Sequence, residues 1–466
     1  MLRTRAEARA VVSGKRPRNI IFMVSDGMSA GVLTLAELAS RAANGKSTEW
    51  VRLLRDASVT RGYFDQASLN SSVTDSSAAS SSWGSGSRVA NGALNTLPDG
   101  TSLTTLAELA RGKGMRVGLV STTAIWDATP AGFAASVPKR SAKDLIVEQY
   151  RHRVDVLLGG GGEAFLADKR ADRKDLLAVY RESGYRVAMT KAELAKVKTG
   201  DRLLGLFGEG QLPYSIDHLR DAEAKNNIPT LAEMSAMALA ALANSPKGFL
   251  LQLEGARIDH AAHANDAAAL IQDQLAFDAA ITVALEFARR DRNTLVVLCT
   301  DHANSNPGLR SMGGASGTSD ECLARAVAAK ASFTAIAKQL GNRADYTMEE
   351  SKASDARSTG AAHVSRVIRE AYGVDLPAAH ASAIARAASG EKGISLNVQQ
   401  DTLAGVLGQV LANVTGIGFV GTSHTADYAT STAVGPGQER FEGLLRNTDV
   451  RAVDATHGHS LQEPDG

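Results

Sequence analysis

The sequence predicts an α/β fold in three layers, with a large, mainly parallel sheet flanked by helices. Short, almost continuously apolar runs are typical of strands buried on both faces. Here they alternate with segments of helical periodicity, which indicates a parallel sheet covered by helices. The strand-like runs are 19–24, 116–120, 154–158, 248–253 and 294–299. The clearest helical segments between them are 103–111, 230–244 and 266–290.

The domain organisation follows from changes in composition along the 466 residues. Residues 1–18 form a basic segment, and 19–454 are expected to form a single α/β domain. Within it, a stretch at about 315–415 is rich in Ala, Ser and Lys and is interpreted as a helical insertion. We expect insertion helices at 324–340, 361–372 and 398–414, and a frayed polar tail at 455–466.

The overall charge argues against a nucleic acid or an anionic membrane as a partner. The chain has 51 basic and 50 acidic residues, so an anion must be bound by a local site. No apolar run is long enough to predict a membrane span, and the basic start lacks the apolar core of an intact signal peptide. Cys299 lies in an apolar run and is expected to be a buried free thiol, while its pairing with Cys322 is left open.

Acidic residues closely follow three of the apolar runs. Asp26 lies two residues after the first run, Glu254 directly follows the fourth, and Asp301 lies two residues after the fifth. An acid often begins a loop, and for one strand that would be the better explanation. Because parallel strands bring their carboxyl ends to one edge of a sheet, where ligands bind, three such acids predict a shared site.

Histidines accompany these acids at spacings that suit metal ligands. Asp259 and His263 are four residues apart, so on a helix they share a face and can ligate one zinc ion. His302 directly follows Asp301, and His424 lies in a small polar loop. An isolated Asp-x-x-x-His pair is usually a surface pair, but this one comes just after an apolar strand.

A serine-rich segment, 72–80, supplies a candidate nucleophile. If Thr74 or Asp75 caps a helix that begins near Ser76, the hydroxyl and the helix N-terminus both face an anion. The alternative is a flexible serine-rich loop, against which Trp83 and two neighbouring alanines count, since they can pack.

Two further side chains suit phosphate chemistry. Thr129 follows another strand-like run and offers a hydroxyl ligand, and Arg140 can bind two phosphate oxygens at once. A single arginine is weak support on its own. The glycine run 159–162 is not a phosphate-binding P-loop, because no Gly-Lys-Ser/Thr follows it.

Together these motifs resemble those of the zinc- and magnesium-dependent alkaline phosphatase family. The matching segments cover 19–313 and 418–450, which is most of the chain. Several independent motifs in the family's order make chance similarity very improbable. They are 73–80 with Trp83 and Gly86, 127–131, 254–263, 300–302 and 422–425.

The resemblance implies a role for each matched position around two zinc ions and one magnesium ion. One zinc would be held by Asp259, His263 and His424. The second zinc would be held by Asp26, Asp301 and His302, and it would also bind the nucleophile Ser76. The magnesium would be held by Asp26, Thr129 and Glu254.

Four other positions bear on phosphate binding by the same resemblance. Arg140 would bind two phosphate oxygens, and Asp75 would orient it. Asp127 and His260 occupy positions that vary in the family and influence magnesium binding and phosphate affinity. Their combination here is usually divided between different branches, which leaves the metal preference open.

The implied activity is hydrolysis of phosphate monoesters to an alcohol and inorganic phosphate through a phosphoserine intermediate. Without metals the acidic cluster would repel a phosphate dianion, so activity should depend on metal. The alternatives are a phosphodiesterase of the same superfamily and a catalytically silent metal- or phosphate-binding relative. Thr129 and Glu254, together with Arg140, favour the monoesterase.

The resemblance also implies export to the periplasm or the cell exterior. A homodimer is expected from the family, although the divergent insertion could alter that surface. The partners implied are small phosphomonoesters and inorganic phosphate, with broad specificity because such sites hold the phosphate and leave the alcohol exposed.

Overall fold

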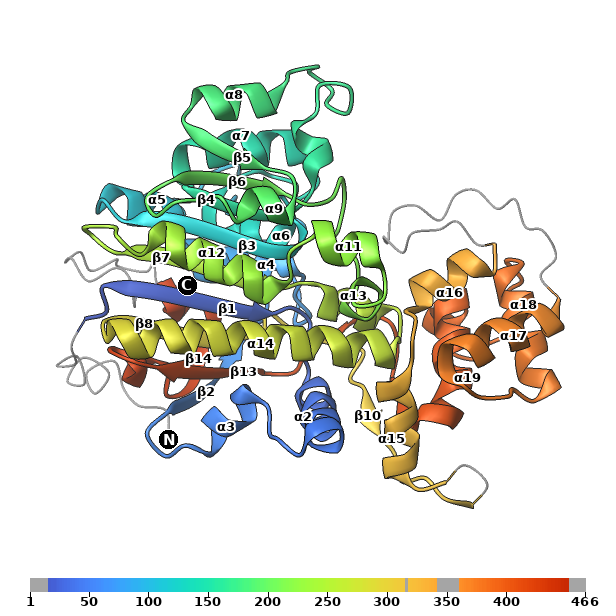
Figure 1. Cartoon of the computed structure of the whole chain (residues 1–466). Coiled ribbons are helices and arrows are strands. Elements are labelled where there is room, and N and C mark those ends of the chain that lie inside the picture. Colours follow the sequence, from blue (N-terminus) through green and yellow to red (C-terminus); the bar gives the residue numbers. More distant parts are fainter. Residues whose placement is uncertain (1–15, 315–316, 342–359, 452–466) are drawn as a thin grey trace.

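The fold is built on a ten-stranded sheet of order β14-β2-β13-β8-β1-β7-β3-β4-β6-β5 (Figure 1). The computed structural model describes residues 16–314, 317–341 and 360–451, so 1–15 and the predicted tail 455–466 lie outside the described residues. The strands are β1 (Asn19–Ser25), β2 (Thr60–Asp65), β3 (Arg116–Ala124), β4 (Val156–Gly160), β5 (Tyr185–Ala188), β6 (Arg202–Leu206), β7 (Phe249–Gly255), β8 (Thr294–Cys299), β13 (Ala429–Val434) and β14 (Gly443–Arg446). Within this sheet β13 runs antiparallel to both neighbours, and the other pairings are parallel.

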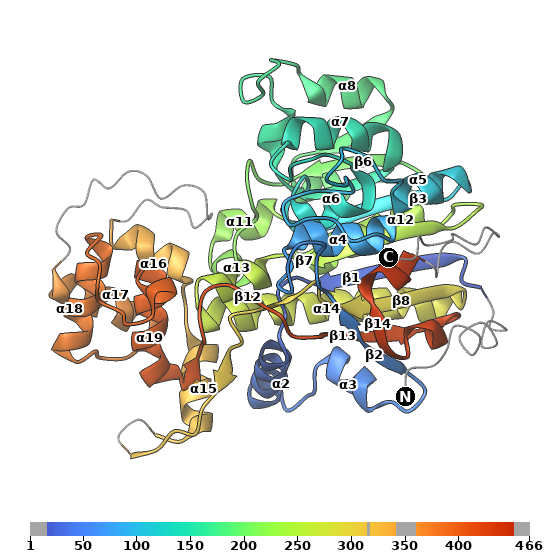
Figure 2. The ribbon, with the colours of Figure 1, turned by 180° about the vertical axis from the view of Figure 1, so that it is seen from behind.

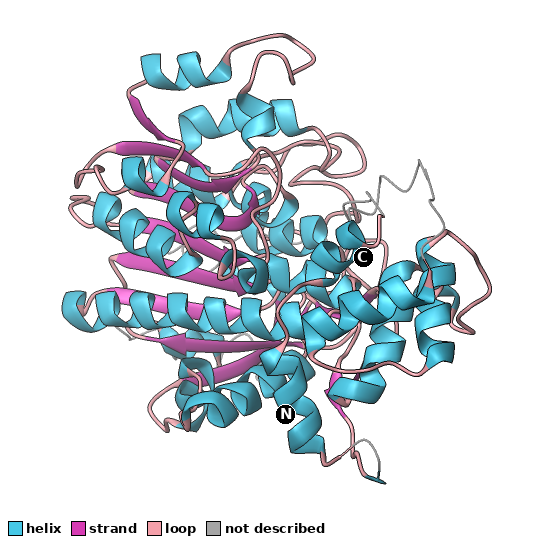
Figure 3. Cartoon of the chain, turned by 45° about the vertical axis from the view of Figure 1, so that its right-hand side comes forward, coloured by secondary structure: helices cyan, strands magenta, loops and turns pink. Residues whose placement is uncertain are grey.

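Helices cover both faces of the sheet and complete three layers (Figure 3). One face carries α2 (Ala30–Asn44), α3 (Glu49–Arg55), α12 (Leu231–Leu242) and α14 (Ala267–Asp291), which lie before the sheet in Figure 1. The other carries α4 (Ser76–Ser85), α5 (Leu106–Gly112), α6 (Ala128–Ala134) and α7 (Lys143–Arg153), which come forward in Figure 2. Because β1 side chains alternate, Ile21 and Met23 join the first core, and Ile20 and Phe22 join the second. The predicted α/β class is therefore confirmed.

All five apolar runs that predicted strands form strands, namely β1, β3, β4, β7 and β8. They occupy the middle of the sheet and are buried almost throughout, which explains their continuous apolar character. Strands toward the sheet edges carried a weaker signal. In β14 most positions are exposed, and β13 is built largely of small and hydroxyl side chains.

Shorter elements lie in the connections. They are the helices α8 (Leu176–Glu182), α9 (Lys191–Leu194), α10 (Ser215–His218), α11 (Ala222–Asn227) and α13 (Arg257–His263), and the two-residue strands β9 (Ala303–Asn304), β10 (Gly308–Leu309), β11 (Ile417–Gly418) and β12 (His424–Thr425). β12 pairs with β9, and β11 pairs with β10.

A group of helices lies at one side of the molecule, at the right in Figure 1. It contains α15 (Ser319–Ala328), α16 (Phe333–Gln339), α17 (Ala361–Tyr372), α18 (Ala378–Ala388) and α19 (Leu403–Thr415). Its apolar side chains are continuous with the core around α12 and α14. The helix expected at 361–372 is present as α17.

Two of the expected helices of this group were wrong in extent. The helix predicted at 324–340 is two helices, because Ser332 caps α16 and also donates its hydroxyl hydrogen to Asp217 Oδ2 at 2.6 Å. Residues Val398–Gln400 of the helix predicted at 398–414 form a separate 3₁₀ turn, and α19 starts at Leu403, capped by Thr402.

The central helix α14 is long and apolar enough to cross a membrane, but 61% of its most apolar window is buried within the fold, as in a core helix. Cys299, in β8, is a buried free thiol as predicted.

Candidate active site

The carboxyl ends of β8, β1 and β7 lie side by side and bring three acids together. β1 lies between the other two strands, with Val24 in register with Cys299 on one side and with Glu254 on the other. Asp26, Glu254 and Asp301 are all buried, at 6%, 1% and 0% exposure. A buried carboxylate is stable only when it is paired, protonated or bound to a cation.

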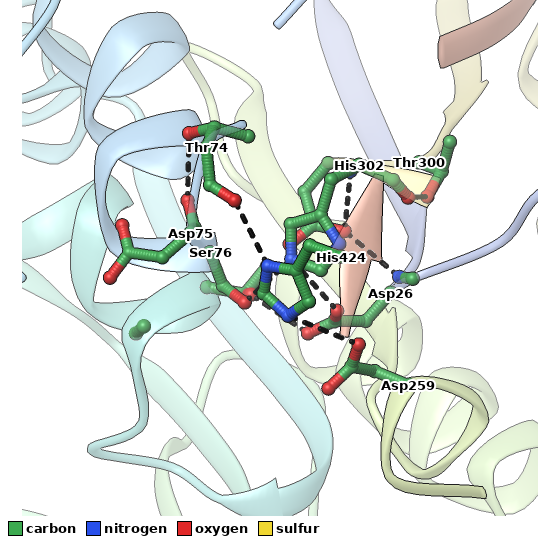
Figure 4. Close-up of polar contacts among 12 residues, drawn as sticks. Asp26, Thr74, Asp75, Ser76, Asp259, Thr300, His302 and His424 are labelled. Carbon is green, nitrogen blue, oxygen red and sulfur yellow. Dashed lines mark hydrogen bonds and ion pairs between the residues drawn. The ribbon is translucent and has the colours of Figure 1, made fainter. Parts of the chain in front are cut away.

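His302 is the centre of one cluster of potential ligand atoms (Figure 4). Its Nε2 lies 3.0 Å from Asp301 Oδ2, 3.8 Å from Asp26 Oδ1 and 3.1 Å from Ser76 Oγ. Asp26 Oδ1 and Asp301 Oδ2 are fully buried and accept no hydrogen bond within the described part of the chain. Two unsatisfied carboxylate oxygens around an imidazole nitrogen form a site that fits a cation.

A second cluster is formed by α13 and β12. His263 Nε2 lies 3.3 Å from Asp259 Oδ2, and His424 Nε2 lies 3.6 Å from Asp259 Oδ1. The two Nε2 atoms are 3.1 Å apart. His424 also stacks on His302 with ring centroids 3.6 Å apart, so the two clusters adjoin (Figure 4).

The tautomers of His263 and His424 follow from their outer hydrogen bonds. His263 Nδ1 lies 2.6 Å from the Thr422 carbonyl oxygen, and His424 Nδ1 lies 2.9 Å from that of Thr74. A carbonyl only accepts, so each Nδ1 carries the hydrogen in the neutral ring and each Nε2 presents a lone pair inward. Two lone pairs facing each other beside a carboxylate repel unless a proton or a metal ion lies between them.

Asp26, Thr129 and Glu254 form a third group next to the first cluster. Thr129 Oγ1 donates to Asp26 Oδ2 at 3.2 Å, and Glu254 accepts a short hydrogen bond from Ser121 Oγ. Burial raises the pKa of Glu254 to about 8. Burial and then the Asp301 carboxylate raise the pKa of Asp26 well above its usual range. This group therefore holds carboxylates that cannot all be ionised without a cation.

The pKa values of the histidines in the two clusters are shifted in opposite directions. Burial, followed by the nearby His302, lowers the pKa of His424 to about 4. Against the effect of burial, the carboxylates of Asp259 and Asp301 raise the pKa of His263 and of His302, respectively. His424 is thus the imidazole most readily available as a neutral ligand at neutral pH.

Ser76 is the first residue of α4, and Asp75 is its N-cap. The Asp75 side chain accepts from Ala78 N at 2.8 Å and from Gly92 N at 2.9 Å, so the chain on both sides is fixed. Residues 76–80 of the serine-rich segment therefore lie in a buried helix, and the flexible-loop alternative is wrong for this part. The helix N-terminus and the Ser76 hydroxyl lie together at the edge of the first cluster.

Arg140 lies between two carboxylates at the site. Its Nη2 is 2.8 Å from Asp127 Oδ1, and its Nη1 is 3.5 Å from Asp75 Oδ2. Burial would lower the pKa of the guanidinium, but Asp127 and Asp75 outweigh that effect and raise it. Arg140 remains 37% exposed at its side chain, so it can still meet an anion.

His260 is held by a residue that the sequence analysis did not single out. Arg257 Nη1 lies 2.7 Å from His260 Nδ1, and burial together with the Arg257 charge lowers the pKa of His260 to about 4. Arg257 is itself stacked on the Tyr214 ring at 3.7 Å and bonded to Gln211. The Arg257 hydrogen bond fixes His260 as the tautomer with its hydrogen on Nε2.

Other supporting residues also escaped the sequence analysis. Asn304 Nδ2 donates to Asp259 Oδ1 at 2.7 Å, and Ser121 donates to Glu254. Ser121 lies in β3, in register with Glu254, so the strand-end rule applied to hydroxyls could have indicated it. Asn304 carries no such signal, because its role depends on the pairing of β9 with β12.

Comparisons with known proteins agree with one another. The alkaline phosphatase family model matches residues 17–457. Alkaline phosphatase 4 of Bacillus subtilis is 29% identical over 443 residues, covering 93% of this chain and 87% of that protein. Alkaline phosphatase of Escherichia coli is 31% identical over 349 residues, covering 65% of this chain and 73% of that protein. The crystal structure of Thermus thermophilus alkaline phosphatase is 33% identical, with a TM-score of 0.85, and the match covers 97% of this chain and 94% of that one. The chain therefore belongs to the alkaline phosphatase family, a metal-dependent family, and is a phosphomonoester hydrolase.

Proposed function

We propose that the chain hydrolyses phosphate monoesters through a phosphoserine intermediate on Ser76, at a site for two zinc ions and one magnesium ion. The observation that carries the proposal is the pair of inward lone pairs on His263 and His424, 3.1 Å apart and beside Asp259. Imidazole nitrogens and carboxylates in this arrangement suit zinc.

The donor sets support three cation positions. The first would be held by Asp259, His263 and His424. The second would be held by Asp26, Asp301 and His302, where two buried carboxylate oxygens accept no hydrogen bond within the described residues. The third would be held by Asp26, Thr129 and Glu254, an all-oxygen set of the kind that magnesium prefers. When bound, such ions polarise phosphoryl oxygens and lower the pKa of a coordinated hydroxyl.

The chain's own residues would carry out the remaining work. The Ser76 Oγ would attack phosphorus, the ester oxygen would leave as the alcohol, and water would then release phosphate from the serine. Arg140 would bind two non-bridging oxygens, since a guanidinium matches that geometry. Asp75 and Asp127 would hold the Arg140 guanidinium in place. The N-terminus of α4 would stabilise the bound phosphate anion.

A monoesterase is favoured over a diesterase. A monoester dianion exposes three non-bridging oxygens and carries more negative charge than a diester. Arg140 and the third proposed cation position add positive charge to the site, which favours the dianion. The test is release of nitrophenol from nitrophenyl phosphate and from bis-nitrophenyl phosphate at alkaline pH. Activity should be higher on the monoester, disappear after chelation and return when zinc and magnesium are added. Equal or preferred hydrolysis of the diester would contradict the proposal.

The role of Ser76 has its own test. Ser76→Ala should lower kcat by about 10³-fold or more while leaving inhibition by phosphate largely intact, because an essential nucleophile is lost and the anion-binding groups remain. Ser82→Ala is the matched control on the same helix, since the Ser82 hydroxyl donates to the Ala78 carbonyl of that helix. Acid-quenched wild-type enzyme should also yield a peptide phosphorylated at Ser76 in mass spectra. Turnover that survives in Ser76→Ala would exclude the serine as nucleophile.

A further inference from the structure

A cavity of about 310 Å³ lies between α12, α14 and the segment that contains α10, and its wall includes Gly255, the residue that follows Glu254. For comparison, a 150 Å³ apolar cavity holds a benzene molecule, so this volume suits a ligand with one ring and a short chain. Its walls are mainly apolar and include Leu212, Leu219, Ile228, Leu231, Leu275 and Ala276. α12 and α14 run side by side on the same face of the sheet (Figure 1).

The polar part of the wall contains the buried carboxylate of Asp273 together with hydroxyl and amide groups, such as those of Thr122 and Gln272, that can donate as well as accept. Asp273, on α14, is 5% exposed, and its carboxylate accepts from Ser215 Oγ at 2.9 Å and Ser215 N at 3.2 Å. A carboxylate offers about four acceptor positions, so Ser215 leaves capacity unused. His218 Nε2 lies 2.9 Å from the Ile228 carbonyl and must therefore donate in the neutral ring, which makes His218 Nδ1 another acceptor.

Arg257 is the cation whose charge acts most strongly on Asp273, although no hydrogen bond or ion pair joins the two within the described residues. Arg257 is engaged by Gln211, by His260 and by the ring of Tyr214. Burial raises the pKa of Asp273 to about 7; the Arg257 charge opposes this rise and the Asp217 carboxylate adds to it. Above about pH 7 the wall therefore combines apolar surface with a buried carboxylate.

We propose that this cavity binds a small organic ammonium ion, with its hydrocarbon body against the leucines and its N–H groups on Asp273. An ammonium group has donors only, which suits the unused acceptor positions of the Asp273 carboxylate, and a buried carboxylate pairs most favourably with a cation. The cavity opens beside the exposed residues Leu219 and Ala279, which gives the ligand an entrance.

The test uses the metal-loaded enzyme and 2-phenylethylammonium, with 2-phenylethanol as the neutral probe of the same shape. Binding is measured by calorimetry in saturating inorganic phosphate, which keeps the phosphatase site occupied. The ammonium should bind with a Kd at least tenfold below that of the alcohol. Equal affinity of the two probes, or displacement of the ammonium by phosphate, would overturn the proposal.

Variants then locate the site. Asp273→Asn should weaken ammonium binding at least tenfold, whereas Asp278→Asn should leave it unchanged. Asp278 lies on the same helix but caps α3 through Glu49 N and Trp50 N and does not line the cavity. Ala276→Leu should abolish binding by filling the cavity, with Ala276→Val as a milder alternative. Hydrolysis of nitrophenyl phosphate should be unchanged in each variant, which shows that it is folded. Undiminished ammonium binding in both Asp273→Asn and Ala276→Leu would place the ligand elsewhere and refute the assignment.

Discussion

Single residues around the clusters act by orienting those that would touch a metal. The carbonyls of Thr74 and Thr422 turn two imidazoles inward, and Asn304 fixes one oxygen of Asp259. Partners of this kind lock ring and carboxylate orientation, so that little conformational freedom is lost when a cation binds. Affinity for metal therefore depends on neutral groups as well as on charged ones.

Replacing Asn304 tests this dependence. Asn304→Ala should lower zinc affinity by about 10- to 100-fold, because Asp259 loses its 2.7 Å hydrogen bond. The measurement is zinc competition with a calibrated chelator. Asn306→Ala is the control from the same segment, since the Asn306 side chain donates to Asp427 and accepts from Thr425, whereas Asn304 donates to Asp259. Equal zinc affinity in wild-type enzyme and Asn304→Ala would show that Asp259 needs no such support.

At the scale of elements, the close packing of α4 against α6 connects Ser76 to Thr129. A Cβ on Gly84 would lie 2.0 Å from the Gly132 carbonyl oxygen, and one on Gly132 would lie 2.1 Å from Ser80 Oγ. Serine hydroxyls of α4 donate hydrogen bonds to backbone carbonyls, and Ser80 Oγ donates to Ala128 O of α6 at 2.9 Å. A helix this rich in serine is stable here because its hydroxyls find backbone acceptors.

A methyl group at this contact should disturb the site from a distance. Gly84→Ala should destabilise the protein by about 1–3 kcal/mol, since backbone must move to relieve the overlap, and it should lower kcat as Ser76 shifts relative to Thr129. Gly112→Ala in α5, where a Cβ meets open space, should be neutral or stabilise by up to about 1 kcal/mol. Urea unfolding and turnover check both. A fully active, equally stable Gly84→Ala would show that the helices can separate freely.

Strands could be predicted from the sequence where burial on both faces gives a continuous run of apolar residues. The central strands β1, β7 and β8 are buried along their length, so their composition indicates them directly. The break between α15 and α16 was not predictable, because Ser332 is bound by Asp217, which is 115 positions away in the chain. Likewise the acids at strand ends were found by a local rule, whereas Asn304 needed knowledge of which loops meet.

At the scale of the whole molecule, Asp266 links the α/β core to the group of helices α15 to α19. It caps α14 through Ala269 N at 3.0 Å and accepts from Phe333 N, in α16, at 2.6 Å. Burial raises the pKa of Asp266 to about 7, against the effect of both donors. The folded protein therefore retains a proton on Asp266 at pH values where the unfolded chain has lost it.

This raised pKa gives a pH dependence of definite sign. The contribution of Asp266 to stability is complete below about pH 4 and is lost as the pH rises through about 7. Between pH 5 and 8 the free energy of unfolding of the wild type, relative to Asp266→Asn, should fall by roughly 3 kcal/mol. Urea unfolding of chelated protein measures this, so that metal occupancy does not vary with pH. Asp175→Asn, at the exposed N-cap of α8, is the matched control. A difference that stays constant with pH would contradict the assignment.

Metal removal should affect the whole fold through the crowded carboxylates. Chelation should lower the Tm by several degrees, because the buried carboxylates of Asp26, Glu254, Asp259 and Asp301 then lose the metal ions that would offset their charge. Because the pKa of Glu254 is about 8, the decrease in Tm on chelation should become larger as the pH rises toward 8. Glu254→Gln should raise the Tm of the chelated protein and reduce the gain on adding magnesium. Scanning calorimetry with and without chelator tests both, and a Tm that is insensitive to chelation would refute the argument.

The spacing of the ligands along the chain also sets an order of events during synthesis. His424 follows Asp26 by 398 positions, and β12, which contains His424, must return to pair with β9. At about 5–20 residues per second, a ribosome needs roughly 20–80 seconds to make the chain between them. His424 follows His263 by 161 positions, so the proposed first metal position lacks its third ligand for roughly the last 8–32 seconds of that interval. With the proposed ligand set, hydrolysis of phosphate esters therefore cannot begin before the segment that contains His424 has been made.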